Sequence, residues 1–342
     1  MSSKGLIGLV LATAAALIVA IVLAAGSGGP SADPQSGAAV LPELAKRADD
    51  VARLTLVHGE SKTTLRRQGD LWVVEEKSGY PADPAKVHQA LLGLAELRYV
   101  EAKTRKPEFY PRLEVEDAGQ KGAKSALVTA SDEKGGLLGE IIAGKRRIDL
   151  LGGGVDGVYV RKPGEAQSWL ASGTLDLAGD ALAWLDRKVI DLPQEKVKEA
   201  VLIQPDGSKL DITRDKPGDP LALKGASAAA KLKSDTAASE PANALAGVEL
   251  ADVRPVAEVT FPKEGVVHAE YTGFDGLTIK VTLVEQDGKS WARFEASGAG
   301  DGEKAAAELN AKLSPWVYAL PDYKAKALKA KLADLVAPPK GS

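Results

Sequence analysis

The chain has no cysteine and only three histidines among its 342 residues, and aromatic residues make up 5% of it. The lack of cysteine excludes disulfides, a thiolate nucleophile, a cysteine-based zinc site and a lipid-modified cysteine. Lys and Arg do not outnumber Asp and Glu, and the formal net charge is −3. Because phosphate contacts need clustered cations, we expect no nucleic-acid partner.

Residues that commonly carry chemistry are scattered. His58, His88 and His268 form no H-E-x-x-H or other paired spacing. Ser131 and Lys134 match the S-x-x-K spacing of serine acylases, but the glycines that follow predict a hairpin loop, which denies the helical geometry that this dyad needs. We therefore predict no catalytic, cofactor-binding or metal-ligating residue, no cofactor and no enzyme activity.

Two glycine clusters resemble phosphate-binding loops. Gly152, Gly154 and Gly157 satisfy G-x-G-x-x-G, but the following VYVRKPG has a strand pattern, whereas a phosphate loop must lead into a helix. We predict a wide hairpin loop there. The cluster Gly298 to Gly302 lies between a strand and a helix, where Asp301 is expected as an ordinary N-cap.

The aromatic residues lie within or beside apolar segments, which favours a role as core anchors. The alternative is an aromatic platform for a sugar or peptide, joined by Tyr80, Tyr110 and Tyr159. Asp186 and Arg187 are expected to form a structural ion pair. The five tryptophans are Trp72, Trp169, Trp184, Trp291 and Trp316.

An uncharged apolar stretch, Gly5–Ala25, is long enough to cross a bilayer as one helix. Its length favours an uncleaved signal anchor, although the small residues at its end leave a cleaved signal peptide as the alternative. Lys4 precedes it and Asp33 follows it, so we expect a cytoplasmic N-terminus and an extracytoplasmic body. This predicts a single-pass protein of a bacterial inner membrane with its body in the periplasm.

We expect an α+β fold in which antiparallel sheets follow the transmembrane helix. Composition and pattern predict a Gly/Ser/Pro-rich linker, then three folded parts and a disordered tail. The predicted segments are anchor 1–25, linker 26–48, first domain 49–193, second unit 194–260, C-terminal unit 261–336 and tail 337–342.

Two stretches show the same order of parts. VARLTLVH, TTLRR and LWVVEE predict three strands from Val51, and Asp83 with Pro84 begins a helix expected to end near Tyr99. VLIQ, KLDITR and GDPLALKG repeat the strands, and LADVRPVAE resembles LAELRYVEA, so that Arg254 corresponds to Arg98. We infer two copies of a strand–strand–strand–helix unit; chance similarity is the alternative.

The remaining segments extend this plan. SALVTAS, LLGEIIAG, GVYVRK and QSWLAS predict strands added to the first sheet, and DALAWLDRKVIDLP predicts a short helix and an extended run. Three further strands joined by Asp275-Gly276 and Asp287-Gly288 form hairpins near the C-terminus. An Ala-rich helix, a strand at WVYAL and a last helix carrying Leu328, Leu332 and Leu335 then complete the body.

With these parts in view, the chain resembles domain-of-unknown-function family 4340 over about Val51 to Val336. The resemblance rests on the N-terminal anchor and on the segments GDLWVVEEKSGYPADPAKVHQALLGL, GVYVRKPGEAQSWLASGTLDLAGDALAWLDRKVIDLP and WVYALPDYKAKAL. It implies a bacterial membrane-anchored envelope protein, often encoded beside ABC transporters of the gliding-motility type. The family has no assigned reaction and hence no catalytic residues to transfer.

Two functions of different classes follow. The favoured one is a non-enzymatic accessory or binding subunit of an ABC-type envelope transport complex. Its expected partners are the lipid bilayer, the transporter's membrane subunits, and an envelope polymer or peptide ligand. The alternative is an envelope hydrolase that acts on a glycan or peptide through paired carboxylates, which the sequence does not locate.

Overall fold

A computed structural model describes residues 35–149, 155–224, 232–234 and 236–337. Within these ranges no helix has both the length and the apolar character needed to cross a membrane. The predicted span, Gly5–Ala25, lies outside the described residues, as does all of the tail beyond residue 337.

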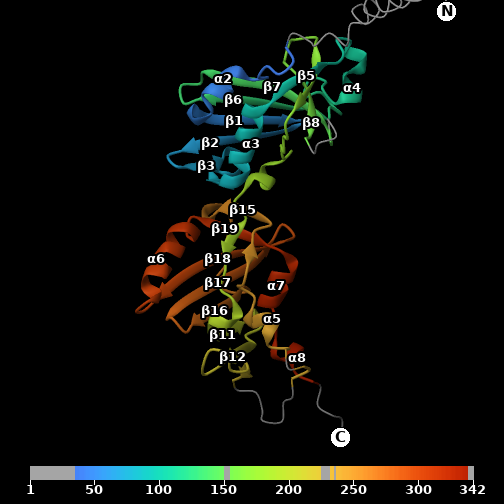
Figure 1. Cartoon of the computed structure of the whole chain (residues 1–342). Coiled ribbons are helices and arrows are strands. Elements are labelled where there is room, and N and C mark those ends of the chain that lie inside the picture. Colours follow the sequence, from blue (N-terminus) through green and yellow to red (C-terminus); the bar gives the residue numbers. More distant parts are fainter. Residues whose placement is uncertain (1–34, 150–154, 225–231, 235, 338–342) are drawn as a thin grey trace, which may run out of the picture. The chain divides into compact units, whose positions relative to one another are not determined.

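The described chain contains two large antiparallel sheets with short helices (Figure 1). In the first sheet the strands follow one another in the order β4-β3-β2-β1-β6-β7-β8-β9-β5. Its strands, in chain order, are β1 Val51–His58, β2 Ser61–Gln68, β3 Leu71–Val74, β4 Tyr80–Pro81, β5 Arg98–Ala102, β6 Ala126–Asp132, β7 Leu137–Arg147, β8 Gly157–Arg161 and β9 Ser168–Ser172.

The second large sheet has the order β13-β12-β11-β16-β17-β18-β19-β15, and β10 pairs with β14 in a small separate ladder. The strands of both are β10 Lys188–Ile190, β11 Val197–Ile203, β12 Lys209–Thr213, β13 Ala222–Leu223, β14 Val248–Glu249, β15 Asp252–Pro255, β16 Val267–Gly273, β17 Leu277–Gln286, β18 Lys289–Gly298 and β19 Trp316–Leu320.

Of the described α-helices, α2 precedes the first strand, α3 to α6 lie between strands, and α7 and α8 follow the last strand. They are α2 Pro42–Lys46, α3 Pro84–Glu96, α4 Tyr110–Leu113, α5 Ser239–Ala242, α6 Gly302–Leu313, α7 Asp322–Leu328 and α8 Leu332–Leu335. The expected mixture of helix and antiparallel sheet is therefore confirmed in the described residues. The single last helix that was predicted is instead two, because the chain leaves the helical conformation at Lys329–Lys331 between α7 and α8.

Both large sheets follow one strand order. The order β3-β2-β1-β6-β7-β8-β9-β5 in the first sheet matches the order β13-β12-β11-β16-β17-β18-β19-β15 in the second, strand for strand. The similarity therefore extends beyond the strand–strand–strand–helix segment, since β6 to β9 correspond to β16 to β19. Residues 194–260 and 261–336, expected as separate parts, contribute strands to one sheet, as the β11–β16 ladder shows.

Local sequence explains these elements. From Arg53 to Val57 in β1, the buried Leu54 and Leu56 alternate with more exposed side chains, as expected of a strand with one face in a core. The N-terminus of α3 is capped as predicted, because the backbone N–H of Ala85 donates to Asp83 Oδ1 at 2.9 Å. However, α3 ends at Glu96 rather than near Tyr99, and Arg98 already belongs to β5.

The chain divides into two compact units. Among the described residues, the first comprises those within 35–51, 57–60 and 90–177, and the second comprises those within 52–56, 61–89 and 178–337. Buried hydrophobic side chains fill each: Leu54, Tyr80, Trp291 and Tyr318 are among those in the second unit, and Leu44, Leu94 and Ile141 among those in the first.

Residues 35–48 were expected to be part of a flexible linker, and this expectation is wrong for the described portion. Gly37 N–H donates to the carbonyl of Tyr99 at 2.7 Å, and Val40 N–H donates to Leu97 at 3.0 Å. Leu44 in α2 is fully buried. A composition rich in small residues suggested a linker, but Val40, Leu41 and Leu44 supply enough apolar surface to order the segment. We call residues 36–40 the strap.

Candidate functional site

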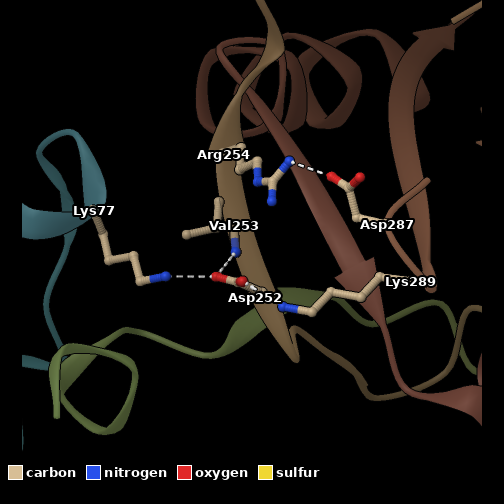
Figure 2. A network of polar contacts seen from close by, with 6 residues as sticks. All are labelled: Lys77, Asp252, Val253, Arg254, Asp287 and Lys289. Carbon is tan, nitrogen blue, oxygen red and sulfur yellow. Dashed lines mark hydrogen bonds and ion pairs between the residues drawn. The ribbon is translucent and has the colours of Figure 1, made fainter. Parts of the chain in front are cut away.

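A set of five charged residues around the buried Asp252 lies in the second unit. It consists of Lys77, Asp252, Arg254, Asp287 and Lys289, which we call the charged cluster (Figure 2). Lys77 ends a short 3-10 helix after β3, Asp252 and Arg254 belong to β15, and Asp287 and Lys289 belong to the β17–β18 hairpin. Three segments far apart in the sequence thus meet at one edge strand.

Asp252 is at the centre of this cluster. Its side chain is 10% exposed, and Lys77 Nζ donates to Oδ1 while Lys289 Nζ donates to Oδ2, each at 2.7 Å. Figure 2 shows the two lysines approaching from opposite sides. The backbone N–H of Val253 also donates to Oδ1, at 2.8 Å. Both carboxylate oxygens are therefore satisfied by charged or backbone donors.

These donors keep Asp252 ionised. Burial works to raise the pKa of Asp252, but hydrogen bonds from Lys289 and Lys77 and from the Val253 amide outweigh it, so the pKa lies below its usual value. An ionised carboxylate held between two ammonium groups is a poor general base, because protonation would break both ion pairs.

Arg254 covers the buried Trp291. Its guanidinium carbon lies 4.6 Å from the centre of the indole ring, and Nη1 donates to Asp287 Oδ2 at 3.3 Å. Trp291 is fully buried and packs with Val259, Val317 and Ala319. The cluster thus fixes β15 to the hairpin and closes one side of an apolar core, which is a binding and positioning arrangement rather than a reactive one.

A second candidate is a cavity of about 800 Å³ in the same unit. Its lining includes Ser290 and four carboxylate residues: Glu240, Glu285, Asp322 and Asp334. Ser290 Oγ donates to Glu285 Oε1 at 2.5 Å, and Lys329 Nζ lies 3.2 Å from Ser290 Oγ while also pairing with Glu285. A serine, a lysine and a carboxylate therefore meet at its wall.

This group lacks an activated nucleophile. Burial works to raise the pKa of Glu285, but Lys329 and Ser290 lower it on balance. Ser290 Oγ and Lys329 Nζ both donate to the same oxygen of Glu285, so the lysine is held by the carboxylate and is not aimed at the serine as a base. The arrangement suits the binding of a polar ligand better than acyl transfer.

A third feature is the buried Lys324 beside a cavity of about 320 Å³. Its ammonium donates to the backbone carbonyls of Asn243 and Ala246, and burial lowers its pKa. The carbonyls belong to the turns after α5, so Lys324 satisfies the end of a helical segment. This is a structural role.

The residues that were weighed as catalytic candidates from the sequence do not come together in one site. His58, His88 and His268 are exposed on β1, α3 and β16 respectively. Ser131 and Lys134 lie at the β6–β7 hairpin, where Asp132 accepts the N–H groups of Lys134 and Gly136. The hairpin interpretation is therefore confirmed.

The glycine clusters have structural explanations where they are described. Gly157 starts a strand that pairs with β7 and β9, and Gly152 and Gly154 lie outside the described residues. Between β18 and α6, a Cβ on Gly298 would lie 2.2 Å from the carbonyl oxygen of Gly302. Glycine is needed there because two backbones meet.

Most of the aromatic residues serve the cores. Trp169, Trp184 and Trp291 are buried, Trp72 and Trp316 are half-buried, and the Tyr80 and Trp316 rings meet edge to face at 5.1 Å. Tyr110 is buried as well. The predicted Asp186–Arg187 ion pair is wrong: Arg187 donates to the carbonyl of Leu250, and Asp186 accepts from the amide of Lys188.

Sequence reasoning missed Asp252, Ser290 and Lys324. One signal was available, since the Asp287-Gly288 turn fixes the hairpin register and places Glu285 opposite Ser290. Nothing in the sequence brings Lys77 to Asp252 or Lys329 to Ser290, because these pairs depend on tertiary structure.

Comparison with known proteins places the chain in a family. Neither the search of curated proteins nor the search of solved structures gave a match. Residues 72–275, which are more than half of the chain and include Lys77 and Asp252, match the family described as Domain of unknown function (DUF4340). The chain therefore belongs to the DUF4340 family.

Proposed function

We propose that the protein is a non-enzymatic, membrane-anchored accessory or binding subunit of an ABC-type transport complex, with its body outside the cytoplasm. The observation that carries the proposal is the uncharged stretch Gly5–Ala25, which satisfies the length and polarity requirements of a single spanning helix. Family membership supports the proposal, because the resemblance to this family implies a membrane-anchored envelope protein that is often encoded beside ABC transporters. The finer architecture belongs to the proposal too: an anchor followed by two copies of one sheet unit.

The described chemistry agrees with a binding role. In the charged cluster each charge has an opposite partner, and the large cavity combines carboxylates with lysines on a partly apolar wall. Tethering raises the effective concentration of such a body near membrane partners, even when the contacts themselves are weak. A membrane-embedded transporter subunit is the partner that benefits most.

Membrane fractionation followed by cross-linking tests this proposal. The full-length protein should sediment with membranes and be cross-linked to transporter membrane subunits. Ala15→Arg places a charge at mid-span, at a cost of about 2.5–3.5 kcal/mol, and should release the protein to the aqueous fraction. The mass of the mature chain separates an anchor from a cleaved signal peptide. Recovery of an uncleaved wild-type chain in the aqueous fraction would overturn the proposal.

The alternative, an envelope hydrolase, has one specific observation in its favour. Glu240, Glu285, Asp322 and Asp334 all line the 800 Å³ cavity. If two of them catalysed glycan or peptide cleavage, two of the variants Glu240→Gln, Glu285→Gln, Asp322→Asn and Asp334→Asn would abolish hydrolysis of envelope polymer fragments by the purified protein. Equal breakdown by wild type and all four variants, or no breakdown, would remove the alternative.

A further inference from the structure

Two cavities of the second unit adjoin each other beside α5 and α7, which pack together (Figure 1). The larger, of about 800 Å³, and the smaller, of about 320 Å³, share Glu240 of α5 and Ala327 of α7 in their linings. Sites for small molecules typically have volumes of about 300–1,000 Å³. Because each cavity alone reaches such a volume, a ligand that enters both must be elongated.

The charges in the two linings balance. The acidic lining residues are Glu240, Glu285, Asp322 and Asp334, and the basic ones are Lys233, Lys324, Lys326 and Lys329. With as many lysines as carboxylates, the linings favour neither a cationic nor an anionic ligand. They suit a ligand that is polar but carries no net charge.

Most of these charged groups are already held in place. Lys329 pairs with Glu285. Lys233 Nζ donates to the carbonyl of Asp334 at 2.8 Å, and the buried Lys324 donates to two backbone carbonyls. Side chains that are fixed beforehand lose little conformational freedom when a ligand binds, which favours binding.

Three charged groups of the linings have no partner among the described residues. Glu240, Asp322 and Lys326 are exposed, and the last two lie one helical turn apart on α7. The two carboxylates can accept hydrogen bonds and the ammonium group can donate them. A hydroxyl group both donates and accepts, so a ligand with many hydroxyls can satisfy all three.

An exposed aromatic ring lines the smaller cavity. Tyr323 is 61% exposed, and Lys324 Nζ lies 5.6 Å from the centre of its ring. The face of an aromatic ring is electron-rich and attracts weakly positive C–H groups. A sugar ring has C–H groups on its faces and hydroxyls around its rim, and it therefore matches a tyrosine that lies beside polar groups.

The same linings suit a peptide less well. Among the described residues that line the larger cavity there is no aromatic side chain, and the apolar ones are alanines, Pro241 and Leu335. An amphipathic helix needs a hydrophobic groove, and an extended peptide needs a sheet edge to pair with. Here the linings come mostly from short helices and turns.

We infer that the two cavities bind one linear, uncharged oligosaccharide, with a sugar ring against Tyr323 and hydroxyl groups on Glu240 and Asp322. This rests on the proposed function, because it names the ligand class of the binding subunit. A ligand that occupies both cavities makes the second set of contacts without a second association step. Affinity should therefore rise with the length of the sugar chain.

Calorimetric titration of the full-length protein tests this inference. The protein is measured in phosphatidylcholine nanodiscs if it sediments with membranes, and in buffer if it does not. The neutral tetramer of N-acetylglucosamine should bind at least about tenfold more tightly than the monomer. It should also bind more tightly than the cationic glucosamine tetramer, the anionic galacturonate tetramer and the neutral peptide tetra-alanine.

Variants locate the binding. Tyr323→Ala should weaken binding of the tetramer about tenfold, whereas Tyr323→Phe, which keeps the ring, should weaken it at most about threefold. Glu240→Ala should weaken binding more than Glu240→Gln, because the amide keeps an acceptor. The matched control is Leu71→Ala. Leu71 is 60% exposed and lines neither cavity, so this change should leave the affinity unaltered.

Several results would overturn the inference: tighter binding of a charged tetramer or of the peptide, equal affinity for monomer and tetramer, equal effects of Tyr323→Ala and Leu71→Ala, or no binding at millimolar sugar. None of them depends on the anchor. The proposed function fails by a different result, the recovery of the uncleaved chain in the aqueous fraction.

Discussion

Strands β5 and β15 occupy the same position in two sheets of one strand order, yet their outer edges are protected differently. The edge of β5 is covered by the strap, which supplies backbone partners to Leu97 and Tyr99. In β15 the N–H of Val253 donates to the side chain of the neighbouring Asp252, and Pro255 has no N–H to offer. An exposed strand edge can pair with other chains. The strap on β5, and Asp252 with Pro255 on β15, each leave fewer free backbone N–H groups at that edge.

The comparison shows that topology and edge chemistry are separable. A covering segment needs a stretch of chain with apolar anchors, such as Leu44 in α2. Side-chain capping needs only two residues of the strand itself, together with cations that hold the aspartate in place. The charged cluster therefore has a role in the fold of the second unit whether or not it also binds a ligand.

The largest effect should come from loosening the cover on β5. Leu44 is fully buried and packs against β7 at Gly139, so Leu44→Ala should lower the free energy of unfolding by about 2–5 kcal/mol. Hydrogen exchange at the Tyr99 amide should accelerate, because that amide donates to Ala38 in the strap. The exposed Lys46→Ala in the same helix serves as the control. Unchanged exchange at Tyr99 would show that the strap does not depend on α2.

A smaller loss is expected from Asp252→Asn. The substitution retains an acceptor for Val253 but removes the charge that pairs with Lys77 and Lys289, which should cost about 1.5–3 kcal/mol. Asp287→Asn is the matched control. Its side chain is 62% exposed and its contact with Arg254 is long, so its effect should stay within about 0.5 kcal/mol in urea unfolding. Equal effects of both substitutions would contradict a special role for Asp252.

The difference between wild type and Asp252→Asn should depend on pH. The folded-state pKa of Asp252 is depressed, so its stabilising contribution is complete above the unfolded value of about 3.9 and is lost as pH falls through the folded value. Urea unfolding of both proteins should show the full difference at neutral pH and a shrinking one below about pH 4. A difference that grew under acid would mean that the ion pairs do not stabilise the fold.

The smallest effect on stability, within about 1 kcal/mol, is expected for Pro255→Val, which restores an N–H to the edge of β15. Its consequence should appear in association, since an uncapped edge offers a donor to a second chain. Light scattering over a concentration series should detect dimers or larger species that the wild type lacks. A strictly monomeric variant would show that Asp252 alone protects this edge.

Much of the fold could be predicted from local signals. Alternating strands, the Asp83 cap and the Asp-Gly turns each depend on a few neighbouring residues, and the structure contains all of them. The resemblance between LAELRYVEA and LADVRPVAE marked β5 and β15 as counterparts, although it was interpreted as the end of a helix. The helix was expected to continue to Tyr99 because β5 follows α3 almost directly.

The candidate sites could not be predicted in the same way. Lys77 and Asp252 meet because a 3-10 helix after β3 lies beside the last strand of another sheet. Lys329 reaches Ser290 from the break after α7, where a continuous helix was predicted. Such pairs are properties of tertiary packing, and no periodicity within the sequence encodes them.

The place of β5 and β15 also has a consequence for how the chain folds. Each is synthesised well before its partner, since three further strands of β6–β9 or β16–β19 must emerge before the last of them pairs with it. Closing such long loops is slow. Until its partner strand pairs with it, β5 or β15 exposes unpaired backbone groups that can bind other chains. Pro255, which has no N–H, protects its part of the edge from the moment the strand leaves the ribosome, whereas the hold on Asp252 is complete only after Lys289 has been synthesised.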